Sequence, residues 1–580
     1  MRSWNAREPI FPGIFIVAVL TFGCMVARAQ TPVPAGEITK FVFDHSRIFP
    51  GTTRFYWIYV PRQYDPAKPA CLFVDQDSIQ FKSPNVFDRL IAEGKMPVTI
   101  AVYVAPGRLK APTTQALDRF NRSFEFDTLS DSYVNFLLDE LLPDVETKMT
   151  SDGRPIRLSH SAVDRAIGGS SSGASCAFTA AWNRPDSFSR VFSAIGSYTN
   201  LRGANIYPLL VRKYEPKAIR IFLQDGSADH NHYAGDWWFA NQELERALTY
   251  AGYEVNHVWG TGDHDHKQAD AIFSDAMIWL WHDWPTPVKA GLGSEQLQQI
   301  LIPGESWQLA VDGMAGTDGP AANDKGEVFF NDGKSGKTLK IGLDGKISEF
   351  LADSHRGAGA AFGPDGRLYM VATATNQIIA YAPDGTPTVI ADGIQHGNDL
   401  VVSASNAVYV TDDSPRGSTE PGRVWYISPK GDKSVVDTGL KFPNGIALSP
   451  DQSLLYVGDY HSHWVYSYQV QPDGSLAFKQ KFYDLYVRDS DDDSAADGMR
   501  VDRDGRLYVS TRAGIQVCEQ AGRVVAIIPT PNGRVSNLSF GGANFDILYA
   551  TCGDKIYARK LKTAGAMSYQ PPFKPAPPKL

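Results

Sequence analysis

Short apolar runs alternate with helical patterns over residues 40–285. Residues 71–74, 98–103 and 218–223 form nearly continuous apolar stretches, which are typical of buried strands. Residues 132–149, 240–251 and 269–281 instead place their apolar side chains at helical spacing. Strands that alternate with helices predict a mostly parallel sheet covered by helices on both faces.

From about residue 305 the pattern changes to one repeated unit. Each copy is a turn rich in Gly, Asp or Asn, followed by a short strand that carries an aromatic residue. The aromatic residues recur at intervals of 40 to 52 residues, at Phe329, Tyr369, Tyr409, Tyr456, Tyr508 and Tyr549. Six turn–strand units at this period predict a six-bladed β-propeller.

The chain is therefore predicted to be multidomain. We expect an α/β domain over residues 40–285, a linker over 286–304 and the propeller over 305–562. The Pro-rich tail, 563–580, is expected to be disordered.

Composition narrows the class of protein. The chain has 580 residues, of which 43% are hydrophobic and 21% charged, so it is globular and neither disordered nor fibrous. The sequence contains no run of about 20 apolar residues, so no transmembrane helix is predicted. The formal net charge is -8 and no Lys/Arg block occurs, which argues against nucleic acid and anionic membranes as partners.

The N-terminus has the features of an export signal. Arg2 and Arg7 precede an apolar run over residues 14–26, which is too short to span a bilayer. An A-x-A cleavage site follows at residues 27–29, which makes Gln30 the expected first residue of the mature chain. The sequence thus predicts a signal peptide over 1–29 and an exported, periplasmic or secreted protein.

Four cysteines remain after this cleavage, and their wide spacing fits neither a disulfide framework nor a zinc site. Cys71 and Cys176 lie in apolar segments and are expected in the core. Cys518 and Cys552 are candidates for a disulfide in an oxidising compartment.

A G-x-S-x-G motif at residues 169–173 places Ser171 between a strand-like run and a helical pattern. This is the context of a nucleophile elbow in an α/β-hydrolase fold. The hydroxyl needs a base to take its proton, and the helix N-terminus offers partial positive charge where an oxyanion would form.

The base and the acid are expected in loops at later strand ends, in the chain order serine, acid, histidine. His264 is the best candidate base, because histidine titrates near neutral pH. His230, His232 and His266 are rivals, and their spacing gives no organised metal site. The acid is Asp229 or Asp225.

Residues 40–285 resemble the enterochelin-esterase-like branch of the putative esterase family. The resemblance implies that Ser171 is the nucleophile, His264 the base and Asp229, rather than Asp225, the acid. It also implies an oxyanion hole formed by the amide of Ser172 and a second amide near Ser78, where relatives usually have glycine. The similarity is carried by residues 74–78, 121–127, 169–173, 224–229, 235–238 and 262–264.

The propeller half carries Asp or Asn at matching loop positions of four blades. Such positions converge at one end of the propeller axis, and carboxylate and amide oxygens suit a hard cation. We therefore expect one divalent ion there, with Ca²⁺ favoured and Zn²⁺ as the alternative. The residues are Asp318, Asn398, Asn444 and Asp497.

These positions resemble the family of senescence marker protein, gluconolactonase and luciferin-regenerating enzyme, over about residues 305–560. The resemblance implies that Asp318, Asn444 and Asp497 hold the ion and that Asn398 lies beside the substrate. It further implies that Asp497 acts as the base in lactone opening. Asp318 departs from the family, which usually has glutamate there.

Together these features predict an exported bifunctional hydrolase. A serine carboxylesterase domain precedes a metal-dependent sugar-lactonase-like propeller, and the substrates are small carbohydrate-derived esters or lactones. The alternative is an active esterase whose propeller is a non-catalytic binding or scaffold module, since fold does not fix function. The sequence leaves the oligomeric state open.

Overall fold

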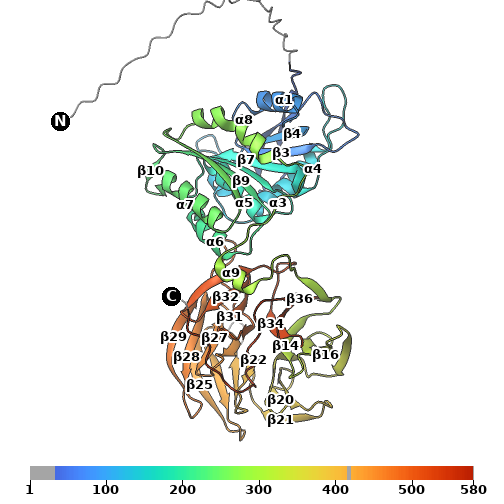
Figure 1. The fold of residues 1–580 in the computed structure, drawn as a ribbon, viewed down its shortest axis with the longest axis vertical. Helices are drawn as coiled ribbons and strands as arrows, with labels where there is room; N and C mark the ends of the chain where they lie inside the picture. Colours follow the sequence, from blue (N-terminus) through green and yellow to red (C-terminus); the bar gives the residue numbers. More distant parts are fainter. Residues whose placement is uncertain (1–32, 414–419, 579–580) are drawn as a thin grey trace, which may run out of the picture.

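Two domains follow one another along the long axis of the molecule, as the computed structural model shows (Figure 1). The structure describes residues 33–413 and 420–578. The predicted signal peptide, residues 1–29, lies outside the described residues. Within those residues no helix is long and apolar enough to cross a membrane.

The first domain is built on a ten-stranded sheet whose core runs β12-β9-β8-β7-β3-β4, all parallel. Antiparallel β2 extends the sheet, pairing with β4, β1 and β5. The strands are β1 (Glu37–Phe43), β2 (Thr52–Val60), β3 (Cys71–Gln76), β4 (Thr99–Val104), β5 (Arg108–Leu109), β6 (Arg119–Phe120), β7 (Arg165–Ser170), β8 (Arg190–Ala194), β9 (Arg220–Gly226) and β12 (Glu254–Gly260), with a separate hairpin of β10 (Asn231–His232) and β11 (Gly235–Asp236).

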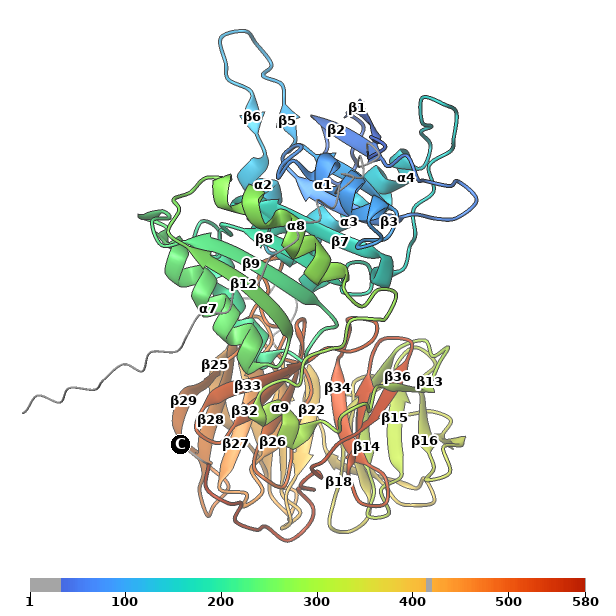
Figure 2. The same cartoon turned by 45° about the horizontal axis from the view of Figure 1, so that its top comes forward.

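Helices cover both faces of this sheet, as the alternating pattern predicts (Figure 2). On one face, α1 and α8 bury a cluster that includes Phe73, Phe87 and Phe273. On the other, α5 and α7 bury Phe178 and Leu244. The helices are α1 (Ser83–Ala92), α2 (Arg122–Phe126), α3 (Ser132–Phe136), α4 (Leu142–Val145), α5 (Ser172–Asn183), α6 (Tyr207–Lys213), α7 (Trp237–Tyr250) and α8 (Lys267–Trp281).

The second domain is a propeller of six four-stranded antiparallel sheets, which confirms the predicted blade number. Every repeated aromatic residue lies on the second strand of its blade. The blades are β14 (Thr317–Ala322), β15 (Val328–Asp332), β16 (Lys337–Ile341), β17 (Ile347–Leu351); β18 (Gly357–Phe362), β19 (Leu368–Ala372), β20 (Gln377–Tyr381), β21 (Pro387–Ala391); β22 (Gly397–Val402), β23 (Val408–Asp412), β24 (Gly422–Ile427), β25 (Lys433–Leu440); β26 (Pro443–Leu448), β27 (Leu454–Asp459), β28 (Trp464–Val470), β29 (Leu476–Asp484); β30 (Met499–Val501), β31 (Leu507–Thr511), β32 (Gly514–Glu519), β33 (Arg523–Ile528); and β34 (Asn537–Gly541), β35 (Ile547–Thr551), β36 (Ile556–Lys560), completed by β13 (Gln308–Val311).

The domains contact each other through more than a linker. Tyr214, at the end of α6, forms a β-bridge with Ile527 of β33. Arg559 of β36 binds both carboxylate oxygens of Glu215, at 2.9 and 2.7 Å. The expected linker contains helix α9 (Glu295–Ile300), whose Leu297 packs into the core of the propeller.

The tail differs from the expected disorder. Gln452 donates a hydrogen bond to the carbonyl of Ser568 (2.7 Å), and the amide of Phe573 donates to Pro450 (3.1 Å). Met567 and Tyr569 line a cavity of about 50 Å³ against the innermost strands. The apolar side chains among the prolines therefore bind this segment to the propeller.

The expected disulfide is not formed. Cys518 lies on β32 and Cys552 directly follows β35, so they belong to different blades. Both are buried and free, as are Cys71 and Cys176. The prediction of a Cys518–Cys552 bridge was wrong, because the two cysteines pack into the apolar core as separate side chains.

Candidate functional site

Ser171 lies on a sharp turn between β7 and α5. Its backbone has φ 57° and ψ −126°, which is strained for a residue with a side chain. The turn needs glycine at position 169, since a Cβ there would lie 2.5 Å from the carbonyl carbon of Gly173, and a Cβ on Gly173 would lie 3.1 Å from Cβ of Gln76. This geometry is that of a nucleophile elbow, which lifts the hydroxyl out of the sheet.

His264 connects Ser171 to a buried acid. Its Nε2 lies 2.8 Å from Ser171 Oγ, and its Nδ1 lies 2.6 Å from Asp229 Oδ1. The Asp229 side chain has no exposed surface, whereas that of His264 is 16% exposed. The structure thus brings the three predicted residues together in the order of a Ser–His–Asp triad.

The second candidate acid, Asp225, lies behind Asp229. It accepts hydrogen bonds from the amide of Gly226 (2.7 Å) and from Nδ2 of Asn241 (2.9 Å). Burial, and then the hydrogen bond and charge of Asp229, raise the pKa of Asp225 to about 9. For Asp229, burial is opposed by hydrogen bonds from His264, from Asp225 and from the amide of His230, and together with the charge of His264 these lower its pKa. Asp229 is therefore the charged member of the pair at neutral pH.

The rival histidines have other contacts. His266 Nε2 lies 2.9 Å from the hydroxyl of Ser170, the neighbour of Ser171. The ring of His230 stacks on that of His264, with centroids 4.3 Å apart. His232 is exposed. Of the four candidates, His264 is the one that contacts Ser171.

The two predicted oxyanion donors come from the start of α5 and from the loop after β3. Ser172 begins α5, where first-turn amides lack partners within the helix. The loop after β3 packs against this turn, since a Cβ on Gly173 would lie 3.3 Å from Asp77 Oδ2. The amide of Asp77 is occupied by the carbonyl of Val104 (2.9 Å), which leaves Ser78 as the predicted donor of this loop.

A second hydroxyl, Ser197, was missed in the sequence. Its Oγ lies 3.3 Å from Ser171 Oγ and accepts a hydrogen bond from Nε1 of Trp237 at 3.1 Å. Because the oxygen of Ser197 accepts the indole N–H of Trp237, the hydroxyl hydrogen of Ser197 is free to be donated to Ser171. No local motif marks Ser197, because it follows β8 and meets the elbow only across the sheet.

In the propeller, the first strand of each blade faces the axis, and equivalent residues form tiers. The pairs Thr317↔Asp332, Gly357↔Ala372, Gly397↔Asp412 and Pro443↔Asp459 begin four blades in the same register. The next residue in each blade forms the first tier. Its six members are Asp318, Ala358, Asn398, Asn444, Asp497 and Ser536.

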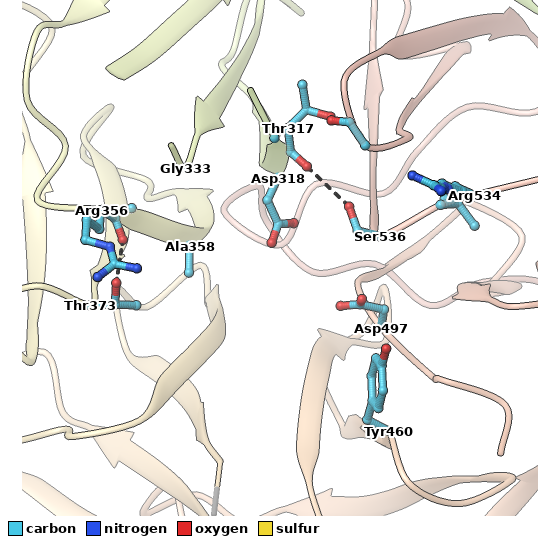
Figure 3. A pocket seen from close by; sticks show the side chains of 14 residues that line it. Thr317, Asp318, Gly333, Arg356, Ala358, Thr373, Tyr460, Asp497, Arg534 and Ser536 are labelled. Carbon is cyan, nitrogen blue, oxygen red and sulfur yellow. Dashed lines mark hydrogen bonds between the residues drawn. The ribbon is translucent and has the colours of Figure 1, made fainter. Parts of the chain in front are cut away.

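This tier opens into a cavity of about 530 Å³. Asp318 and Asp497 line it and face the same space in Figure 3. Burial raises the pKa of both carboxyl groups, and the charges of Asp318 and Asp399 raise that of Asp497 further. Asn398 is instead tied to Asp413 through a hydrogen bond of 2.9 Å.

The tier fits a divalent cation by its chemistry. Two carboxyl groups with raised pKa values face each other, and the buried Oδ1 of Asn444 has no hydrogen-bond partner among the described residues. A hard cation would satisfy all three oxygens. Within the described residues, no cluster of three His, Cys, Asp or Glu side chains has metal-binding geometry, so such a site depends on the Asn444 amide.

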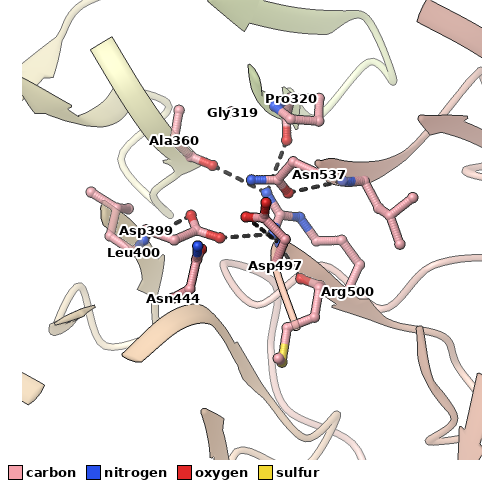
Figure 4. A network of polar contacts seen from close by, with 12 residues as sticks. Gly319, Pro320, Ala360, Asp399, Leu400, Asn444, Asp497, Arg500 and Asn537 are labelled. Atoms are coloured by element: carbon pink, nitrogen blue, oxygen red, sulfur yellow. Dashed lines mark hydrogen bonds and ion pairs between the residues drawn. The ribbon is translucent and has the colours of Figure 1, made fainter. Parts of the chain in front are cut away.

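A polar cluster beneath the first tier contains three residues that the sequence did not reveal. Asp399, Asn537 and Arg500 meet beneath the first tier (Figure 4). Arg500 donates to the carbonyls of Pro320 (2.9 Å) and Ala360 (3.3 Å), and its Nη1 lies 3.9 Å from Asp399 Oδ2. Burial, opposed by the charge of Arg500, raises the pKa of Asp399 to about 6.

Comparisons with known families assign both halves. The putative esterase family matches residues 50–298, and the SMP-30/gluconolactonase/LRE-like region matches residues 316–554. The chain carries one domain of each family. It is a hydrolase of the ester- and lactone-cleaving kind, with an esterase domain followed by a gluconolactonase-like propeller.

Individual relatives cover one domain each. A gluconolactonase of Zymomonas mobilis is 27% identical over 312 residues, which are 47% of this chain and 86% of that protein. A gluconolactonase structure from Xanthomonas campestris matches the gluconolactonase-like propeller with 25% identity and a TM-score of 0.41, covering 46% and 93% of the two chains. The enterobactin esterase of Shigella flexneri matches with 20% identity and a TM-score of 0.32, covering 43% of this chain and 61% of its own.

Proposed function

We propose that the protein is a bifunctional hydrolase, in which Ser171 cleaves carboxylic esters and the propeller opens sugar lactones. The observation that carries this proposal is the unbroken chain of contacts from Ser171 through His264 to Asp229, at 2.8 and 2.6 Å. The cavity formed by Asp318 and Asp497 supports the second activity.

In the esterase reaction, His264 takes the proton of Ser171 as Oγ attacks the ester carbonyl. Asp229 holds the Nδ1–H tautomer and stabilises the imidazolium that results. The amides of Ser172 and Ser78 would stabilise the oxyanion. His264 then returns the proton to the leaving alcohol, and water, activated by the same histidine, releases the acid from Ser171.

In the propeller, Asp318, Asn444 and Asp497 would hold one divalent ion, with Ca²⁺ favoured over Zn²⁺. Such an ion supplies polarisation of a lactone carbonyl when bound. Asp497 is the proposed base, accepting a proton from the attacking water. Asn398, held by Asp413, would orient the hydroxyl groups of the substrate.

Two single variants separate the activities. Ser171→Ala should abolish hydrolysis of p-nitrophenyl acetate and leave gluconolactone hydrolysis intact, and Asp497→Ala should do the reverse. EDTA should remove the lactonase activity alone. Unchanged ester hydrolysis in Ser171→Ala, or lactone hydrolysis that survives both EDTA and Asp497→Ala, would contradict the proposal.

A second candidate function keeps the esterase and makes the propeller a binding module. The observation that favours this binding function is Arg500, whose positive charge lies beneath the carboxylates of Asp318 and Asp497. Under this alternative, calorimetry would show binding of Ca²⁺ or sugar acids, while no lactone in a panel would be hydrolysed.

We also propose that the protein is exported and that its substrates derive from carbohydrates. The charged flank, apolar run and A-x-A site of residues 1–29 support export. N-terminal sequencing of the mature protein from its native host should begin at Gln30. A cytoplasmic product that retains Met1 would contradict this part of the proposal.

A further inference from the structure

Two arginines lie at the rim of the propeller cavity, above the carboxylates. Arg356 directly precedes β18 in the second blade, and Arg534 precedes β34 in the sixth. These blades flank the first blade, which supplies Asp318. Both arginines line the 530 Å³ cavity, on opposite sides of Asp318 and Asp497 in Figure 3.

Neither guanidinium group is neutralised by the protein. Among the described side chains, no carboxylate lies within 4.0 Å of Arg356 or Arg534. Both side chains are exposed, and the Arg534 guanidinium lies against Gly553, with Nη1 3.8 Å from where a Cβ would be. Arg500, lower in the channel, contrasts with them because only 18% of its side chain is exposed and its Nη1 lies 3.9 Å from Asp399.

The backbone that presents Arg356 is strained. His355 and Arg356 have φ values of 54° and 55°, a left-handed conformation that non-glycine residues seldom adopt. The hydroxyl of Thr373 donates to the carbonyl of Arg356 at 2.7 Å and fixes this turn. Strained turns of this kind persist where the surrounding structure enforces them, and they concentrate at functional sites.

The charges of the lining residues indicate what kind of substrate fits. Asp318 and Asp497 supply the two carboxylates that line the cavity, and a divalent ion between them would balance their negative charge. The guanidinium groups of Arg356 and Arg534 would then remain unbalanced at the mouth of the cavity. Guanidinium groups bind carboxylate and phosphate groups with two hydrogen bonds each.

We propose that the propeller selects lactones that carry an anionic group away from the reacting carbonyl, and that Arg356 and Arg534 bind this group. The inference rests on the proposed lactonase function and names its substrate class. Two kinds of substrate carry such an anionic group: sugar acids, through a carboxylate, and sugar phosphates.

The test compares three probes: gluconolactone, which is neutral, glucarolactone, which carries a carboxylate, and phosphogluconolactone. Arg356→Asn removes the charge and suits the left-handed backbone, and Arg534→Gln removes the second. Each should raise KM for an anionic probe by about tenfold and leave KM for gluconolactone unchanged. The anionic probe with the lower KM in the unmodified protein identifies the source.

Arg356→Lys and Arg534→Lys are the matched controls. They keep the charge and should recover part of the loss, which a merely structural defect would not do. Calorimetric binding of glucarate against gluconate, in the presence of Ca²⁺, gives a readout that needs no turnover. If all three lactones are hydrolysed with equal KM values, and the neutral variants do not alter them, the inference is overturned. If none is hydrolysed, the lactonase proposal fails instead.

Discussion

Replacing Asp229 by asparagine tests which carboxyl group serves His264. Asp229 Oδ1 lies 2.6 Å from Nδ1 of His264, in a fully buried position. At an effective dielectric constant of about 20, opposite unit charges at that separation attract by about 6 kcal/mol. Because this attraction exists only while His264 holds the proton of Ser171, Asp229→Asn should lower kcat by roughly 10⁴-fold.

Asp225→Asn is the matched control, since the two acids lie four residues apart at one strand end. The pKa of Asp225 is raised to about 9, so this group is already neutral at neutral pH. An amide of the same shape keeps it neutral and disturbs one buried hydrogen bond, which should lower kcat by less than about tenfold.

The assay is release of p-nitrophenolate from p-nitrophenyl acetate under saturating substrate, with circular dichroism to establish that each variant is folded. Similar losses in the two variants, or a larger loss in Asp225→Asn, would refute the assignment of Asp229 as the charged partner. A folded Asp229→Asn enzyme with nearly normal kcat would refute the electrostatic reasoning itself.

Three further predictions concern stability. Glu125→Gln should lower the free energy of unfolding of the first domain by about 3–5 kcal/mol in urea titrations, because it leaves the fully buried Arg54, now 2.7 Å from Glu125, without its counter-charge. A reducing agent should leave Tm unchanged, because all four described cysteines are free; a drop of several degrees would contradict the structure. Truncation after Lys562 should lower the Tm of the propeller while Ser171 keeps its esterase activity, because the tail packs on the propeller; an unchanged Tm would contradict this prediction.

The residues around Ser171 could be predicted because their signals are local. The G-x-S-x-G turn fixes the nucleophile, and the strand ends that follow it limit the histidine and the acid to short segments. The choice between Asp225 and Asp229 depends on burial and on which carboxyl group His264 contacts. Neither property can be predicted from the spacing of these residues in the sequence.

The propeller shows the same division. The repeat predicts six blades and the first tier, since equivalent positions of a closed ring must converge on its axis. The polar cluster beneath the first tier was not predicted, because Arg500 stands where other blades have Ala321, Ala361, Val401 and Ala447, so no repeated position marks it. The tail was misjudged because composition alone does not show that Met567 and Tyr569 find an apolar surface.

The closure of the propeller ties the two halves together mechanically. The sixth blade is complete only when β13, the first strand after α9, pairs with β36, the last strand of the ring. The neighbouring ion pair between Glu215 and Arg559 fastens the esterase domain to that same last strand. A force that separates the two domains would therefore act directly on the pairing of β13 with β36 that closes the propeller. The esterase domain thus helps to hold the propeller closed.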